Sequence, residues 1–144
     1  MTSTELERPV AIGKLKREPC VAREFAGLVR SGEARLSDAA NAALAIESRF
    51  DLAYNAAHAL ALAALRAKGY RSDNRYVVFQ ALPHTLGLPT ATWRVLATCH
   101  ERRNLAEYEG VVDVDQRLMT DLLAAARAVL DAVRAFGPPE QRNV

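Results

Sequence analysis

The chain has 144 residues, which is long enough for one compact domain with a buried core and too short for two domains of ordinary size. Half of the residues are hydrophobic but only 6% are aromatic, so Ala, Leu and Val must supply most of the core. The 19 basic and 17 acidic residues leave a net charge of +2, which excludes a global attraction to a polyanion and confines any nucleic-acid contact to a local patch.

Composition divides the chain into an extended N-terminal arm over residues 1–18, a helical domain over residues 19–137 and a polar tail over residues 138–144. The arm is expected because residues 1–18 carry many charges and show no sustained hydrophobic period. The first nine residues also lack the apolar run of a signal peptide, so a cytoplasmic, bacterial-type location is expected.

Four main helices and one short helix are predicted from hydrophobic spacing and from capping residues. Their approximate ranges are 21–41, 48–68, 75–85, 89–110 and 113–136. Gly27 and Gly32 predict a kink or a break near Ser31-Gly32, and Pro83 predicts a bend or an early end of the short helix. No strand-like alternation of useful length is visible. The predicted fold class is therefore all-α, an up-and-down four-helix bundle with one short extra helix.

The starts and stops of these helices are expected at specific residues. Ser48-Arg49-Phe50-Asp51 has the form of a capping box, as has Asp113-x-x-Gln116, and Ser72-Asp73-Asn74 predicts the start of the short helix. Gly110 is expected to end the helix before it.

The second predicted helix is apolar around nearly its whole circumference, which places it at the centre of the bundle. Its most apolar segment, Ala53 to Leu65, is shorter than the ~20 residues of a membrane span and contains Asn55 and His58. We expect a buried helix and no membrane contact.

The segment Cys99 to Gly110 gathers most of the functional side-chain types of the chain. On a continuous helix His100, Asn104 and Tyr108 lie along one stripe, with Arg103 beside His100 and one turn before Glu107. An arginine holds a phosphate through two parallel hydrogen bonds, and the asparagine and tyrosine add further donors. The stripe is therefore a candidate phosphate-recognition surface. The alternative interpretation is a solvated helix face with Glu–Arg pairs of a few tenths of a kcal/mol each.

The motif Arg103-Asn104-x-x-x-Tyr108 resembles the Arg-Asn-x-x-x-His motif of HEPN domains, small helical proteins that often act as RNA-cutting toxins or nucleotide-binding partners. The segment from Ser48 to Ala61 also looks like the long second helix of that family. Gly69-Tyr70 and the Leu82–Leu86 segment match in order and spacing. The resemblance covers about residues 20 to 135.

The resemblance implies a homodimer formed through the motif-bearing face, an RNA or nucleotide ligand, and a nucleotidyltransferase partner as in toxin–antitoxin pairs. It makes Arg103 the phosphate binder and Asn104 the positioning residue, and gives Tyr108 the position of the catalytic histidine. His100 and Arg102 are further candidates for phosphate binding because of their place on the same helix. In the family, RNA cleavage needs no metal. Supporting positions are Glu107 and, at the start of the second helix, Arg49 and Asp51, where a charged side chain can orient the motif arginine.

The tyrosine leaves two functions open. Tyrosine has an ordinary pKa of ~10, more than three units above the ~6.5 of histidine, so without activation it makes a slow general base. One hypothesis is an RNA- or nucleotide-binding protein with metal-independent endoribonuclease activity. The alternative is a catalytically inactive helical module for dimerisation or protein interaction.

No metal or cofactor is expected. The three histidines, His58, His84 and His100, form no helical His-x-x-x-His pair, and glycine-rich phosphate loops are missing from the sequence. Cys20 and Cys99 are too few for a disulfide framework, so two free thiols are expected.

Overall fold

The computed structural model of the chain describes residues 6–8, 13–110 and 112–137, and the predicted polar tail lies outside them. Four long helices dominate: α2 (Ala22–Ala39), α3 (Ile46–Ala67), α6 (Thr90–Glu109) and α7 (Gln116–Phe136). Two short helices, α4 (Arg75–Gln80) and α5 (Leu82–Thr85), connect α3 to α6. The prediction of a predominantly helical protein is confirmed.

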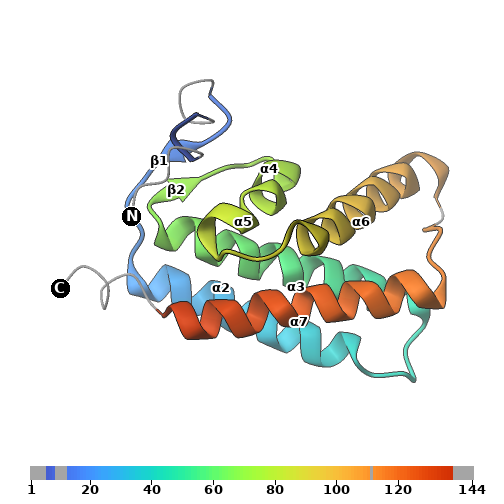
Figure 1. The fold of residues 1–144 in the computed structure, drawn as a ribbon. Helices are drawn as coiled ribbons and strands as arrows, with labels where there is room; N and C mark the ends of the chain where they lie inside the picture. Colours follow the sequence, from blue (N-terminus) through green and yellow to red (C-terminus); the bar gives the residue numbers. More distant parts are fainter. Residues whose placement is uncertain (1–5, 9–12, 111, 138–144) are drawn as a thin grey trace.

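Helix α3 is the centre of the fold and contacts each of the other three long helices. In Figure 1 the chain runs through α2 and α6 in one direction and through α3 and α7 in the other. Most residues of α3 between Phe50 and Ala67 are buried, as its apolar circumference predicts. None of the helices in the described ranges is long and apolar enough to cross a membrane.

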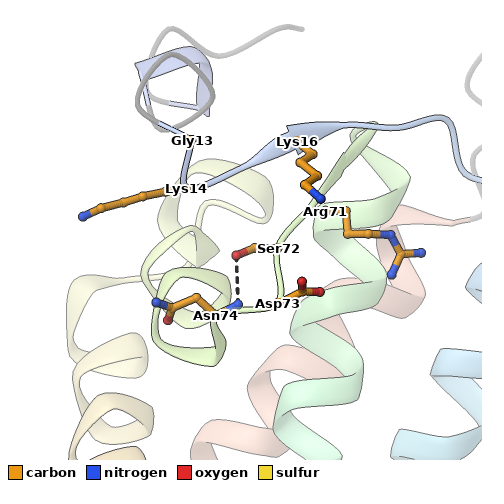
Figure 2. Close-up of a pocket in the computed structure, with 7 residues that line it drawn as sticks. All are labelled: Gly13, Lys14, Lys16, Arg71, Ser72, Asp73 and Asn74. Carbon is orange, nitrogen blue, oxygen red and sulfur yellow. Dashed lines mark hydrogen bonds between the residues drawn. The ribbon is translucent and has the colours of Figure 1, made fainter.

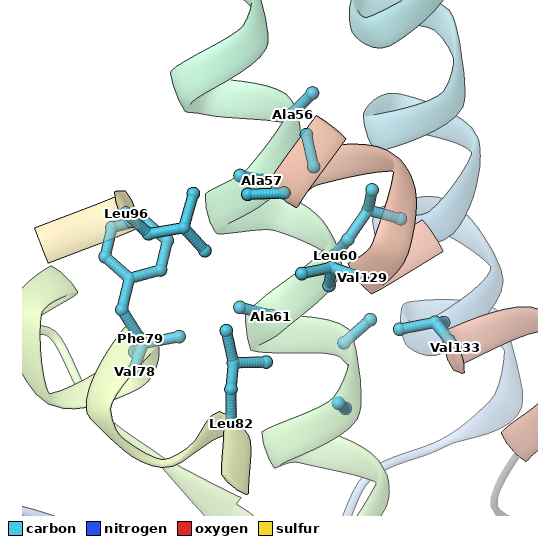
Figure 3. Close-up of a cluster of buried hydrophobic side chains, with 14 of the residues drawn as sticks. Ala56, Ala57, Leu60, Ala61, Val78, Phe79, Leu82, Leu96, Val129 and Val133 are labelled. Carbon is cyan, nitrogen blue, oxygen red and sulfur yellow. The ribbon is translucent and has the colours of Figure 1, made fainter. Parts of the chain in front are cut away.

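Small side chains let the helices approach closely at the core. Figure 3 shows alanines and Leu60 of α3 facing Val129 and Val133 of α7, with Phe79 and Leu96 on the other side of α3. Gly32 of α2 makes the closest approach, because a Cβ atom there would lie 2.5 Å from the Leu60 Cγ atom. The predicted break at Ser31-Gly32 does not occur: α2 is continuous from Ala22 to Ala39, and Gly32 allows close packing against Leu60.

Both predicted capping boxes are misplaced, by three residues at α3, where Ala45 is the N-cap, and by two residues at α7, where Asp115 is the N-cap. α3 begins at Ile46, whose side chain packs against the core, so Ser48 and Asp51 lie inside the helix. α7 begins after Asp115, whose side chain accepts a hydrogen bond from the Leu118 amide at 2.8 Å. In both cases apolar residues beside the predicted start pack against the core and move the helix boundary.

Three local predictions are confirmed. Asn74 caps α4 by accepting a hydrogen bond from the Val77 amide, and Pro83 coincides with the break between α4 and α5. Gly110 ends α6 with a positive φ of 76°, a conformation that favours glycine. Helix ends are thus predicted correctly from the sequence where a single capping side chain or a single backbone angle determines them.

The described part of the N-terminal arm is fastened to α3. β1 (Lys16–Arg17) pairs antiparallel with β2 (Tyr70–Arg71), and the Tyr70 hydroxyl donates to Glu7. Arg66, which is almost fully buried, donates to the backbone carbonyls of Glu18, Pro19 and Tyr70 and pairs with Glu24. Leu6 and Leu15 add their side chains to the core. These contacts fix where residues 13–18 lie beside the Ser72–Asn74 loop.

Candidate phosphate-binding site

The candidate site lies where α6 leaves the core. The buried residues of α6, Leu96, Ala97 and Cys99, all precede the motif, whereas its C-terminal half is mostly exposed. The motif side chains therefore project from a helix whose first half is anchored. There they contact side chains of α3 and α4.

Both ring nitrogens of His100 have hydrogen-bond partners. Its Nδ1 atom is 2.9 Å from the Tyr54 hydroxyl of α3, and its Nε2 atom is 3.1 Å from Nδ2 of Asn104. With Asn104 donating to Nε2, the ring carries its proton on Nδ1 and donates it to Tyr54. The predicted stripe of His100 and Asn104 thus exists, and it is continued by a buried tyrosine that the sequence analysis did not assign.

Two arginines converge on the ring of that tyrosine. The guanidinium carbon of Arg103 lies 5.1 Å from the Tyr54 ring centroid, and that of Arg75 lies 5.4 Å from it. Tyr54 is fully buried, so these cation–π contacts form at the edge of the core where water is partly excluded. Arg75 also donates to the side-chain oxygen of Asn55 at 2.9 Å.

The positive charges of the two arginines help to lower the pKa values of two nearby histidines. The pKa of His100 is lowered, first by burial and then by the positive charges of Arg75 and Arg103. Burial and the same two arginines lower the pKa of His58 to about 4. His58 packs edge-on against Phe79 of α4 at 6.0 Å. The site therefore keeps neutral imidazoles beside two fixed cations.

Few negative charges compensate these cations. Asp51 of α3 lies 3.5 Å from the Nε atom of Arg103, and Glu107 lies 3.9 Å from its Nη1 atom. Both carboxylates are more than 60% exposed, and both separations are too long for strong hydrogen bonds. Within the described ranges, Arg103 donates no side-chain hydrogen bond and is free to grip an anion with its fork.

Aromatic side chains border the cluster. Tyr76 of α4 lies 6.1 Å from the His100 ring and meets Trp93 of α6 edge-on at 6.0 Å. Tyr76 is partly exposed, so an aromatic surface adjoins the two arginines. Flat apolar rings beside guanidinium groups suit a ligand that combines a phosphate with a base.

The structure separates the remaining sequence-predicted residues from the cluster. Arg102 donates to the Asp113 carbonyl at 2.7 Å and so ties α6 to the connection before α7. Arg49 donates to the Ala39 carbonyl at 2.8 Å and satisfies the end of α2, which leaves only Asp51 of the supporting pair beside Arg103. Tyr108 is 89% exposed, close to the end of α6.

Tyr54, Asn55, Arg75 and Tyr76 are the site residues that sequence reasoning missed. Arg75 was placed only at the start of a short helix and Tyr54 only on an apolar face. The Tyr54–His100 contact joins residues 46 positions apart, and no local pattern encodes such a pair.

Other side chains with reactive potential are occupied or buried. Both cysteines are free thiols, as predicted, and burial raises the pKa of Cys99 to about 12. The described residues contain no cluster of three or more His, Cys, Asp or Glu that could hold a metal ion. No protein-family model, curated protein or solved structure matches the chain.

Proposed function

We propose that this chain is a HEPN-like up-and-down bundle that binds the phosphate groups of RNA or of a nucleotide on the face shared by α3, α4 and α6. One observation carries the proposal: Arg75 and Arg103 converge on Tyr54 beside a neutral His100. The motif resemblance predicts a phosphate binder at Arg103, and the second arginine, from another helix, supplies the charge that one arginine alone lacks.

The geometry favours a phosphate over a carboxylate. Two guanidinium groups beside the Tyr54 ring offer several hydrogen-bond donors and two positive charges, which matches the three or more acceptor oxygens and the charge of a phosphate. Tyr76 and Trp93, at the border of the site, add aromatic rings on which a base can stack. Because the pKa of His100 is lowered, its neutral ring adds no positive charge to those of the two arginines.

The proposal is for binding. RNA cleavage at this face requires a proton acceptor beside the scissile phosphate, and Tyr108, in the position of the family histidine, points into solvent. Eight residues separate Tyr108 from His100, or about 12 Å along the helix axis. The proposal therefore assigns no catalytic base to this face.

Binding of a short single-stranded RNA to the purified full chain tests the proposal. Arg103→Gln should weaken binding by about 10- to 100-fold, since it removes a charge-assisted contact of roughly 1.5–3 kcal/mol. It should also reduce the slope of log affinity against log salt by ~0.7, the value for one phosphate contact on a single strand. Arg127→Gln, an exposed arginine on α7, is the control with the same loss of charge. Equal affinity of all three proteins would contradict the proposal.

A second candidate function, a homodimerisation or protein-interaction module, is favoured by a different observation. Leu105 is 54% exposed and Tyr108 is 89% exposed, and they lie one turn apart at the projecting end of α6. A second copy of the chain seated on the motif-bearing face would cover both.

Sedimentation of the wild-type chain and of a Leu105→Glu, Tyr108→Glu double variant tests this second function. A wild-type dimer that the double variant converts to a monomer supports it. A wild-type monomer at all concentrations contradicts it and leaves RNA binding to be judged by the Arg103→Gln experiment.

A further inference from the structure

A cavity of about 260 Å³ lies outside the motif face, between the N-terminal arm and the loop that leads into α4. Its walls come from two segments far apart in the sequence, residues 13–16 and 71–74, which the pairing of Lys16 with Arg71 holds together. Three of the seven lining residues are cations. Figure 2 shows Lys14 and Lys16 extending to different sides above Ser72, Asp73 and Asn74.

The cations of this cavity differ in how they are paired. Arg71 is held by Glu18 at 2.6 Å and by Glu24 at 2.8 Å, so its charge is largely matched and its position is fixed. Lys14 and Lys16 have exposed side chains, and within the described ranges neither meets a carboxylate. The unmatched positive charge of the cavity therefore belongs to the two lysines.

The loop below the lysines retains hydrogen-bond donors. The Ser72 Oγ atom accepts from the Asn74 amide at 3.1 Å, which leaves its hydroxyl proton available. The Asn74 side-chain oxygen accepts from the Val77 amide, which leaves its NH₂ group available. Asp73 is the one carboxylate among the lining residues, and its side chain is exposed.

We propose that this cavity binds a compact small molecule with two or more negative phosphate charges, such as a free polyphosphate or the phosphate end of a nucleotide. Lys16 above the loop, Lys14 on the other side of the cavity and two neutral donors provide charge and hydrogen bonds together. The volume lies just below the ~300 Å³ at which drug-sized ligand pockets begin, so the ligand is compact. None of the seven lining residues belongs to the cluster of Tyr54, Arg75, His100 and Arg103, so this proposal does not depend on the proposed function.

Inorganic pyrophosphate, titrated by calorimetry at low salt into the full chain, is the probe. We expect saturable binding that Lys16→Gln weakens by about tenfold, the effect of losing one charge-assisted contact of ~1.4 kcal/mol. Asp73→Asn should strengthen binding, because it removes the one repelling charge. Both side chains are exposed, so neither variant is expected to disturb folding.

Controls separate this site from non-specific attraction and from the motif face. Arg127→Gln removes one charge elsewhere and should leave pyrophosphate affinity within twofold of wild type, as should Arg103→Gln. The proposal is overturned if the wild type shows no saturable binding, or if Arg127→Gln weakens binding as much as Lys16→Gln does. It is also overturned if Lys16→Gln weakens only the binding of a short RNA, because the cavity would then hold a nucleic-acid backbone.

Discussion

The Tyr54 hydroxyl of α3 and the Nδ1 atom of His100 on α6 lie 2.9 Å apart and join the centre of the core to the projecting motif. Asn104 holds the other ring nitrogen at 3.1 Å. The imidazole is therefore fixed from both sides, and its plane lies within 25° of the Tyr54 ring. Arg75 and Arg103 are placed against the same tyrosine, so this one buried side chain positions every cation of the candidate site.

This arrangement predicts the tautomer of His100. With Asn104 donating to Nε2, the neutral ring should carry its proton on Nδ1, and ¹⁵N NMR of the imidazole nitrogens measures this directly. Tyr54→Phe removes the acceptor of that proton and should weaken the preference, which Asn104 alone then maintains, at a cost of about 1 kcal/mol in the free energy of unfolding. Phe79→Leu, a core change beside the same tyrosine, should lower stability and keep the tautomer. A proton on Nε2 in the wild type would contradict the geometry.

His58 predicts a loss of stability in mild acid. Its pKa is lowered to about 4 in the folded protein, first by burial, against 6.5 when unfolded. Between these values the unfolded chain binds the extra proton, so the free energy of unfolding falls as the pH drops from about 6.5 towards 4, by roughly 2–3 kcal/mol from this residue. His58→Leu should remove that part of the slope in urea unfolding measured across the range. An identical pH dependence in the variant would disprove this origin.

Gly32 and Gly27 on α2 give a matched pair of substitutions. A Cβ atom at Gly32 would meet Leu60 at 2.5 Å, so Gly32→Ala should destabilise the protein by about 1–2 kcal/mol despite the better helix propensity of alanine. Gly27 has no atom within 4 Å of its added Cβ, and Gly27→Ala should stabilise by up to ~1 kcal/mol. Urea unfolding of both variants gives the comparison. A stabilising Gly32→Ala would mean that α2 and α3 are less tightly packed than described.

The sequence predicted what depends on local pattern. The apolar circumference of residues 48–68 indicated the central helix, and Asn74 and Gly110 marked helix ends that the structure confirms. The helix starts near Ser48 and Asp113 were misplaced because capping side chains compete with the packing of Ile46, Val112 and Val114, which is a tertiary effect.

The candidate site could be predicted only on one helix. Spacing placed His100, Arg103 and Asn104 on one face, but Tyr54 and Arg75 join them through contacts between helices that no spacing encodes. From the sequence, Arg102 was expected beside Arg103 at the phosphate and Arg49 in a supporting role. Arg49 and Arg102 instead donate to the carbonyls of Ala39 and Asp113. These hydrogen bonds depend on where the connections between helices lie, so the sequence did not predict them.

The central claim is that Arg75 and Arg103 bind one phosphate together. The direct measurement is a double-mutant cycle in short single-stranded RNA affinity, using Arg75→Gln, Arg103→Gln and the double variant of the full chain. We expect each single variant to weaken binding by at least about tenfold and the double variant to weaken it by clearly less than the product of the two effects. Two independent effects that multiply, or no effect of Arg75→Gln, would show that the two arginines do not form a common phosphate site.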